Sequence, residues 1–227
     1  MVSTNLCVAL LRQTGKNSHC QIGELVTSVR IGRASIEEVL RDLHEKGLVT
    51  LAGEVVIVSP EQRMRIAAAA VGQGSDPETI SRHLRWQEFE LLADRVLVQS
   101  DYATKTHFVF KRDGRRFEMD VLGAKDPLLL CIDCKHWQYG WAPSRVSAAA
   151  KNQLLRVTSL SQTFRRYESI LGTSQWKSVR MLPMLLTLAD VSSRVVDGVP
   201  TVSALRFGTF LSEIGPWVEK LRFVDAR

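Results

Sequence analysis

The segment from Leu128 to His136 restricts the possible folds more than any other part of this chain. It opens with the apolar run LLLCI, which predicts a strand buried within a sheet. Because side chains alternate along a strand, Asp133 and Lys135 then share one face. Unpaired charges are costly in the centre of a sheet, so these two side chains must pair, lie at the strand end or hold an ion.

The residues on either side of this strand predict a mixed sheet flanked by helices. Turn residues bound the strands, with Gly114 in a first hairpin and Asp126-Pro127 in a second. An apolar segment after Val202 predicts a closing strand and helix. The fold class expected is therefore α/β, of the α+β kind, with one compact sheet. In chain order, the pattern predicts a helix, three strands, a helix and a strand at residues 77–98, 106–112, 116–123, 128–136, 144–170 and 180–188.

Residues 1–60 predict a separate small domain of three helices followed by a hairpin. Ser35 has the position of an N-cap for the third helix, with Glu38 three positions on, and Gly47 ends that helix. Two short strands are expected at 48–51 and 54–58. This order, and above all the stretch SIEEVLRDLHEKGLVTLAGEVVIVSP, resembles a winged helix-turn-helix domain.

The winged-helix resemblance implies contact with DNA, because the third helix of such a domain enters the major groove. Arg30 and Arg33 precede this helix and Arg41 lies on its polar side, so the resemblance implies that they contact phosphates or bases. The same helix also carries acidic residues, which repel phosphate. A domain that docks proteins or dimerises therefore stays open as the alternative.

The boundary between the two parts is expected in a short connecting segment. The stretch PEQRMRIAAAAV predicts a helix that starts at Pro60, and GQGSD, at residues 72–76, has the composition of a linker. The predicted organisation is a winged-helix domain at 1–60, a connecting helix and linker at 61–76, and a second domain at 77–227.

The bulk composition favours a globular protein with a basic surface. The net charge is +6 and the pI about 9.3, which favours nucleic acid as a partner over an anionic membrane. No apolar run approaches the ~20 residues of a membrane helix, and no secretion signal is visible, so we expect a cytoplasmic protein without a membrane partner. Cys131 and Cys134 form a C-x-x-C with no second pair, and their spacing favours two buried thiols over a zinc or redox site.

The polar residues of the second part follow a motif. Asp120 interrupts the apolar stretch FEMDVLG, and the next strand ends in Asp133-x-Lys135. The preceding helix contains FELLA within WQEFELLADRVL. Together these segments, from about Trp86 to Leu188, resemble the PD-(D/E)xK (restriction-endonuclease-like) nuclease superfamily, and within it the Mrr-type and archaeal Holliday-junction-resolvase-like branches.

The nuclease resemblance implies a metal-dependent active site and assigns a role to each matching residue. Glu90, Asp120 and Asp133 would be the acids around Mg²⁺, for which Mn²⁺ is a substitute, and Lys135 would be the catalytic lysine. The sequence motif departs from that of the family in three ways. Met119 occupies a position where Pro is common, and the strand acid is Asp133 where Glu or Gln is more usual. In addition, Glu88 is an alternative to Glu90 for the helix position. No organic cofactor is implied.

The function implied is a DNA endonuclease acting in repair, recombination or restriction, with DNA as partner and a homodimer as one option. Two alternatives remain: a non-cleaving regulator or repair scaffold on a nuclease fold, and an RNA-processing nuclease. Arg145 and Lys151 make the helix at 144–170 basic. These side chains would either contact the phosphate backbone of a nucleic acid or simply face the solvent. Aromatic residues at 137, 139 and 141 fit base stacking, or a core or interface.

Overall fold

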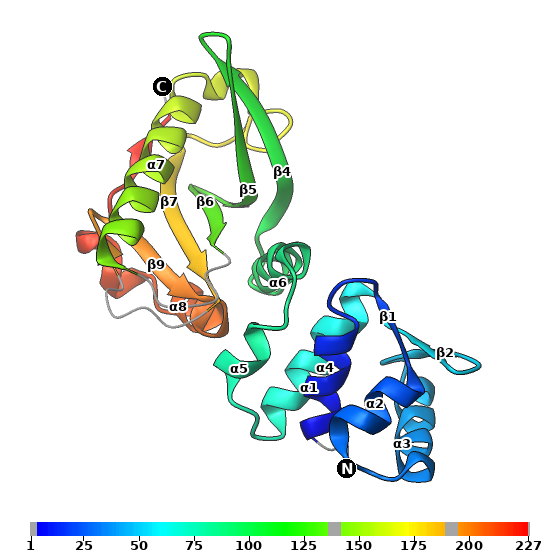
Figure 1. The fold of residues 1–227 in the computed structure, drawn as a ribbon. Coiled ribbons are helices and arrows are strands. Elements are labelled where there is room, and N and C mark those ends of the chain that lie inside the picture. Colours follow the sequence, from blue (N-terminus) through cyan, green and yellow to red (C-terminus); the bar gives the residue numbers. More distant parts are fainter. Residues whose placement is uncertain (1–3, 136–141, 189–194, 227) are drawn as a thin grey trace. The chain divides into compact units, whose positions relative to one another are not determined.

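The computed structural model describes residues 4–135, 142–188 and 195–226, and it divides into two compact units. The first unit is Met1–Glu88 and the second is Phe89–Arg227 (Figure 1). No helix in the described part of the chain is both long enough and apolar enough to span a bilayer.

The first unit is built from helices around a small antiparallel sheet, in which β3 lies between β1 and β2. The predicted order of three helices and a hairpin is present, and a short strand between the first two helices was missed, because it is defined only by its pairing with β3. The elements of this unit are α1 (Thr4–Gln13), β1 (His19–Gln21), α2 (Ile22–Val29), α3 (Arg33–Glu45), β2 (Thr50–Ala52), β3 (Val55–Ile57), α4 (Pro60–Gly72) and α5 (Pro77–Ser81).

Helix α3 begins earlier than predicted. Its N-cap is Gly32, which makes no side-chain cap, so the prediction of Ser35 as the N-cap is wrong. The additional first turn is held by the guanidinium of Arg33, whose Nε donates to Glu37 Oε1 at 2.6 Å one turn further on. The hairpin that follows contributes Glu54, which also accepts from Arg33.

A fully buried arginine organises the first unit. The side chain of Arg63 is 0% exposed and donates to the carbonyl of Leu11 at 2.7 Å, to the hydroxyl of Thr14 and to the carbonyl of His83. Its Nε forms an ion pair with Glu88, the last residue of this unit. A buried charge requires such partners, so Arg63 joins α4 to α1 and to the segment that leads into the next helix.

The predicted long helix at 77–98 is interrupted. Helix α5 ends at Ser81 and α6 (Trp86–Gln99) starts after a break. The carboxylate of Glu88 accepts from the backbone N–H of Arg85 at 2.8 Å and so caps the new helix, while the guanidinium of Arg85 donates to the carbonyls of Thr14 and Gly15. These buried polar contacts explain the break, and they explain why the first unit extends to Glu88 rather than ending in the 60–76 segment.

The second unit contains one mixed sheet of seven strands, in the order β4-β5-β6-β7-β9-β8, with β10 also paired to β7. The first three strands are antiparallel neighbours, whereas β7 runs parallel to both β6 and β9. After the remainder of α6, the elements are β4 (Ala103–Arg112), β5 (Arg115–Lys125), β6 (Leu128–Lys135), α7 (Pro143–Ser161), η1 (Phe164–Arg166), β7 (Arg180–Thr187), β8 (Val195–Val196), β9 (Val199–Ser203), η2 (Ala204–Arg206), α8 (Phe207–Ser212), η3 (Gly215–Lys220) and β10 (Val224–Asp225).

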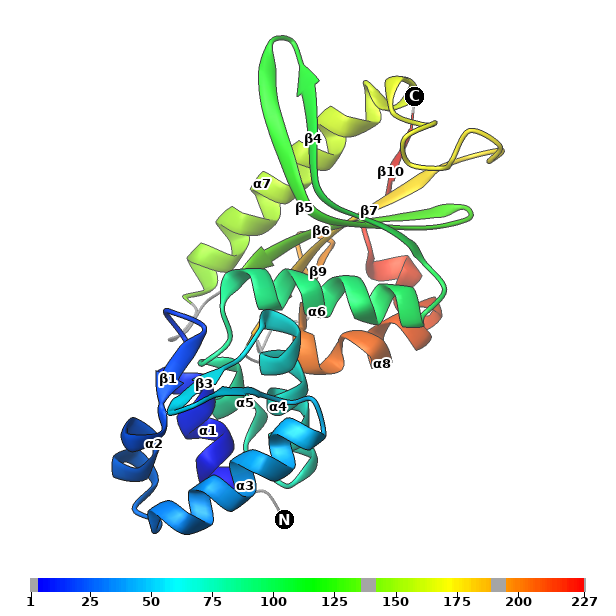
Figure 2. The same cartoon turned by 90° about the vertical axis from the view of Figure 1, so that its right-hand side faces the viewer.

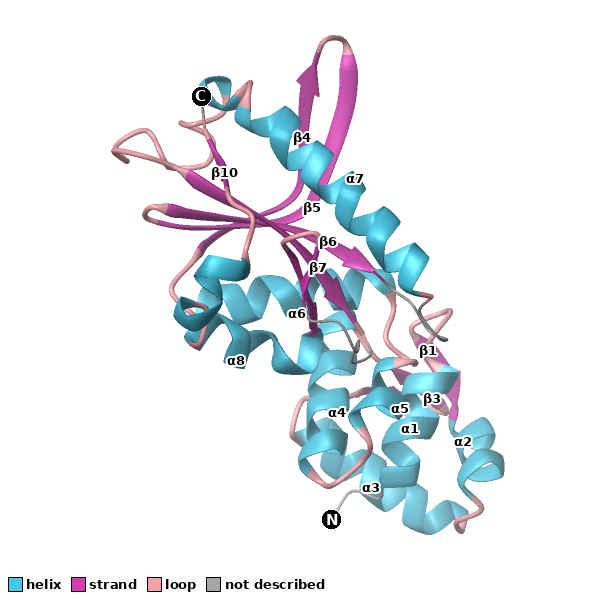
Figure 3. Ribbon diagram, turned by 90° about the vertical axis from the view of Figure 1, so that its left-hand side faces the viewer, coloured by secondary structure: helices cyan, strands magenta, loops and turns pink. Residues whose placement is uncertain are grey.

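Helices cover both faces of this sheet, which confirms the predicted α+β class with a central mixed sheet. Figures 2 and 3 show α7 on one face and α6 with α8 on the other. On the α7 face, Val157 and Leu160 pack with Leu129 of β6 in one core. On the other face, a Cβ at Gly123 would lie 2.8 Å from Leu97 of α6, so the glycine permits this close approach.

Helix α7 ends at Ser161, nine residues before the predicted end at 170. The stretch around this end carries serines and Thr163, which have low helix propensity, and Phe164 then turns its ring into the core. The strand predictions are close to the structure, although β4 begins at Ala103 and β5 extends to Lys125.

Candidate active site

The site predicted from the sequence lies where the β5–β6 ladder stops. The last paired residues are Val121 and Ile132, so Asp120 and Asp133 come next on the two strands. Beyond this point, the backbone N–H of Cys134 donates to Asp120 Oδ2 at 2.7 Å, in place of a strand carbonyl. A carboxylate that accepts a main-chain hydrogen bond is held in position, so the strand geometry fixes Asp120 beside the end of β6.

Asp133 is buried and lies between two cations. Its Oδ2 is 2.7 Å from Nζ of Lys135, two residues on along β6, and its Oδ1 accepts from Nη1 of Arg156 at 2.6 Å. Arg156 comes from α7, which lies over this face of the sheet. Both carboxylate oxygens are therefore engaged, and burial makes each of these charge-assisted contacts strong.

The environment of Asp120 disfavours its ionised form. Burial, followed by the negative charge of Asp133 and, more weakly, that of Glu90, raises the pKa of Asp120 to about 6. The hydrogen bond from Cys134 and the charge of Lys135 act in the opposite direction. Glu90, Asp133 and Lys135, the other three residues assigned by the nuclease resemblance, therefore all lie within electrostatic reach of Asp120.

The two glutamates at the start of α6 have different surroundings. Glu88 is occupied by the buried ion pair with Arg63 and by the helix cap, both within the first unit. Glu90 is also buried, but it belongs to the second unit, and its Oε2 lies 3.3 Å from Nε2 of His107. Of the pair, Glu90 is the one whose negative charge helps to raise the pKa of Asp120.

Two further residues border the site that sequence reasoning did not assign to it. His107 contacts both Glu90 and Glu118, and its backbone has a positive φ of 49°, opposite Asp120, where the β4–β5 register skips a pair. Arg156 lies on the helix at 144–170, which the sequence shows to be basic without distinguishing this residue. A histidine on the strand that precedes Asp120 could have been predicted from the sequence to lie near the site. The position of Arg156 could not, because it depends on how α7 packs against the sheet.

A second residue of α7, Gln153, lies deeper. It is fully buried, and its Nε2 donates to the carbonyl of Cys131 at 2.7 Å, while its Oε1 has no partner among the described residues. The amide ties α7 to β6 two residues before Asp133, so it helps set the height of the helix over the site.

The donor set fits a hard divalent cation. Carboxylate oxygens are the ligands that Mg²⁺ prefers, and two neighbouring carboxylates, Asp120 and Asp133, lie at the same end of the β5–β6 ladder. Among the described residues, no three His, Cys, Asp or Glu side chains are grouped as a complete metal cluster. Mg²⁺ commonly uses only one or two carboxylates together with waters and substrate phosphates, so Asp120 and Asp133 would be its protein ligands.

The basic residues predicted to contact DNA are all exposed. Arg30, Arg33 and Arg41 lie in the first unit, where the guanidinium of Arg33 bonds to Glu37 and Glu54. Arg145 and Lys151 lie on α7 in the second unit. The predicted stacking aromatics at 137, 139 and 141 fall outside the described residues.

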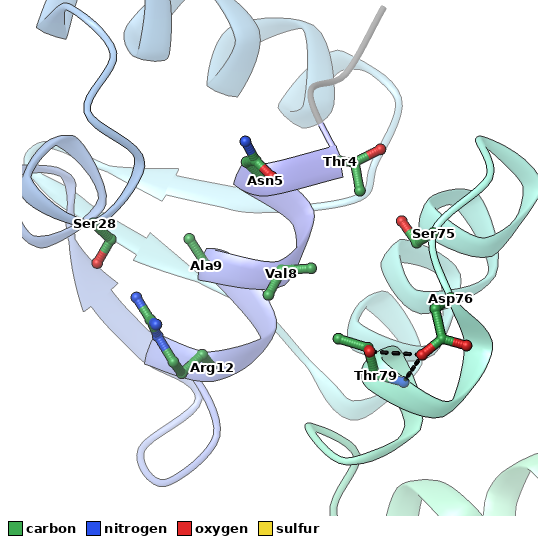
Figure 4. Close-up of a pocket in the computed structure, with 9 residues that line it drawn as sticks. All are labelled: Thr4, Asn5, Val8, Ala9, Arg12, Ser28, Ser75, Asp76 and Thr79. Carbon is green, nitrogen blue, oxygen red and sulfur yellow. Dashed lines mark hydrogen bonds between the residues drawn. The ribbon is translucent and has the colours of Figure 1, made fainter. Parts of the chain in front are cut away.

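Neither the cysteines nor the pocket in the first unit contributes to the predicted site. All four cysteines are free and buried, and burial raises the pKa of Cys131 and of Cys134, as expected for inert thiols. A cavity of about 380 Å³ lies between α1 and the start of α5 (Figure 4). Asp76 on its wall accepts from the backbone N–H of Thr79 at 2.9 Å and so caps α5.

Comparison with known proteins leaves the family open. No protein-family model matches the chain. An uncharacterized protein of Archaeoglobus fulgidus is 27% identical over 142 residues, a match that covers 62% of this chain and 100% of that protein.

Among solved structures, the similarities are distant. Protein VC1899 from Vibrio cholerae matches with a TM-score of 0.41 and 13% identity over 96% of this chain. Can2 from Sulfobacillus thermosulfidooxidans, in complex with cyclic tetra-adenylate, matches with a TM-score of 0.36 and 10% identity over 91% of this chain. AF1548, a protein of unknown function, matches with a TM-score of 0.30 and 14% identity over 56% of this chain. The chain spans about half the length of each, at 52%, 50% and 53%, and similarity at this level establishes neither a shared fold nor an activity.

Proposed function

We propose that this chain is a Mg²⁺-dependent DNA endonuclease of the PD-(D/E)xK kind, directed to its substrate by a winged-helix domain at residues 1–60. One observation carries the proposal: Asp120 and Asp133 are neighbours at the end of the β5–β6 ladder, with Lys135 two residues further along β6. Glu90 of α6 adds a third carboxylate within electrostatic reach.

Each of these side chains has a role in phosphodiester hydrolysis. Asp120 and Asp133 would hold Mg²⁺, which supplies a polarised phosphoryl oxygen and a bound water of lowered pKa. Lys135 would stabilise the negative charge that develops on the phosphate oxygens, since its ammonium is held near the site by Asp133. Glu90, with His107 beside it, would orient the attacking water.

Lys135 and Arg156 would also bind the substrate, by exchanging the carboxylate of Asp133 for a phosphate group. Both cations face the carboxylate of Asp133. A phosphate group entering the site offers them a new anionic partner, which would leave Asp133 available as a ligand. The two cations would thereby bind the substrate phosphate, and Asp133 would become available to the metal ion.

The test is a nicking assay on supercoiled plasmid DNA with Mg²⁺, Mn²⁺ or EDTA, with duplex RNA as a parallel substrate. We expect nicking with either metal and none with EDTA. Lys135→Ala should reduce the rate by at least about a hundredfold, as expected for removal of one electrostatic contact to the transition state, and should leave DNA affinity largely intact.

The matched control is Lys177→Ala, which removes an exposed lysine of the same unit and should leave nicking unchanged. Wild-type rates in the Lys135→Ala variant would refute the assignment. Cleavage of the RNA duplex alone would replace DNA by RNA as the substrate.

A non-cleaving nucleic-acid-binding protein is the second candidate, and one observation favours it. Both oxygens of Asp133 already have cationic partners, which is the arrangement expected of a structural ion-pair network. In the same assay, this function predicts DNA binding without nicking under any metal condition.

A further inference from the structure

The tip of the β4–β5 hairpin concentrates positive charge. The sequence there is KRDGRR, four cations against one aspartate, and Asp113 and Gly114 form the turn with positive φ. Figures 1 and 2 show this hairpin extending beyond the other strands of the sheet. The tip is therefore a basic projection from the second unit.

The cations of the tip face one another across the two strands. Lys111 is paired in register with Arg116, and Arg112 with Arg115. Like charges directly opposite each other destabilise a strand pair, so this arrangement weakens the hairpin in isolation. A polyanion bound at the tip would remove that repulsion.

The two faces of the hairpin differ in the contacts that their cations make. On one face, Phe110 and Phe117 pack into the core beneath α7, and Arg112 and Arg115 continue that face. These two arginines are engaged locally, Arg112 with Asp113 at 3.2 Å and Arg115 over the ring of Phe117.

The opposite face carries Lys111 and Arg116. Arg116 pairs with Glu118 but keeps 65% of its side chain exposed, against 33% for Arg112, and Lys111 has no acidic partner among the described residues. A chain of contacts on this face leads back to the candidate active site: Arg116 to Glu118 at 3.3 Å, Glu118 to His107 at 3.6 Å, and His107 to Glu90 at 3.3 Å.

We propose that Lys111 and Arg116 form a clamp for the phosphate backbone of a duplex nucleic acid whose cleavage point lies at Asp120, an inference that rests on the proposed function. Arg116 precedes Asp120 by four residues on β5, which spans about 13 Å at about 3.3 Å per residue. Phosphates along one strand of a duplex are about 3.4 Å apart along the axis, so the clamp would contact the backbone about four nucleotides from the site.

The experiment measures the affinity of the full chain for a 30-base-pair DNA duplex, and for an RNA duplex of the same sequence, over a series of salt concentrations in EDTA. The test variant is Lys111→Ala/Arg116→Ala. The matched control is Arg112→Ala/Arg115→Ala, which removes the same charge from the other face of the same turn. Circular dichroism verifies that both variants fold.

We expect the test variant to bind roughly ten- to a hundredfold more weakly at 0.1 M salt, and to flatten the slope of log K against log salt by about 2, since each phosphate contact contributes about 0.9. The control variant should change the slope by less than half as much. The DNA and RNA arms identify which duplex the clamp accepts.

Other outcomes separate the clamp from the proposed function. Unchanged affinity in the test variant, or equal losses in both variants, overturns the clamp while leaving metal-dependent nicking by the wild type intact. Weaker duplex binding by the test variant alone, with no nicking by the wild type, supports the clamp and contradicts the proposed nuclease activity. Binding to vesicles with 30% phosphatidylserine, but to neither duplex, overturns the clamp in favour of a membrane surface.

Discussion

The carboxyl group of Asp120 experiences opposing influences. Burial and two neighbouring carboxylates disfavour its charge, while the N–H of Cys134 and the ammonium of Lys135 favour it, and the first group prevails. A pKa of about 6 means that the apo protein at neutral pH holds an ionised group at a cost in stability.

Replacing Asp120 by Asn should reveal this cost. Because the folded pKa lies above the unfolded value, the wild type binds the proton more tightly when folded, and it loses stability as the pH rises from about 4 to 6. In metal-free buffer, Asp120→Asn should be more stable than the wild type by about 2 kcal/mol above pH 6, from about 1.4 kcal/mol per pKa unit with a discount for partial exposure. Urea unfolding at pH 4.5, 6 and 8 measures the difference, and a difference independent of pH would contradict the assignment.

Arg156 competes for the same carboxylate that would bind the metal. Its guanidinium contacts Asp133 Oδ1 at 2.6 Å, so its removal should leave that oxygen available. We expect Arg156→Gln to bind Mg²⁺ several-fold more tightly than the wild type in the absence of nucleic acid, as measured by calorimetry. Unchanged or weaker Mg²⁺ binding would show that Arg156 does not compete with the metal ion for Asp133.

At the scale of elements, helix α6 carries two buried glutamates with separate tasks. Glu88→Gln leaves the charge of Arg63 buried without its anion, and such a loss costs about 3–5 kcal/mol. Glu90→Gln removes a buried negative charge that repels Asp120, so it should leave stability unchanged or slightly raised. Denaturation and nicking assays on the two variants distinguish them: a loss of stability for Glu88→Gln, and a loss of cleavage without a loss of stability for Glu90→Gln. The reverse pattern would exchange their roles.

The elements that the sequence predicted well are those with a strong period. The buried strand that ends in Asp133-x-Lys135 and the hairpin around Gly114 follow directly from alternation and turn residues. The start of α3 and the break before α6 do not, because Arg33 also pairs with Glu54 and Arg63 pairs with Glu88, and both partners are distant in the sequence. Proximity of Asp120 to Asp133 was predictable from the motif, whereas the approach of Arg156 to Asp133 required the packing of α7.

At the scale of the whole molecule, the chain divides into two compact units, and a substitution that destabilises one should leave the other folded. Hydrogen exchange measured by mass spectrometry gives the test with Glu88→Gln. Peptides from α1 and α4, which Arg63 joins, should exchange faster, while peptides from β5, β6 and β7 should keep wild-type protection. Equal acceleration in both units would show that they unfold as one cooperative body.

The sheet ends at β4, whose outer edge pairs with no other strand in the part of the chain that the structure describes. An open edge of this kind can recruit the same edge of a second molecule, and charged side chains along it are a common protection against self-association. Lys105, Lys111 and Arg112 lie on that strand. Variants that lack these charges should therefore aggregate through this edge, and more so at higher protein concentration. The wild-type protein should remain in solution at salt concentrations at which such variants begin to precipitate.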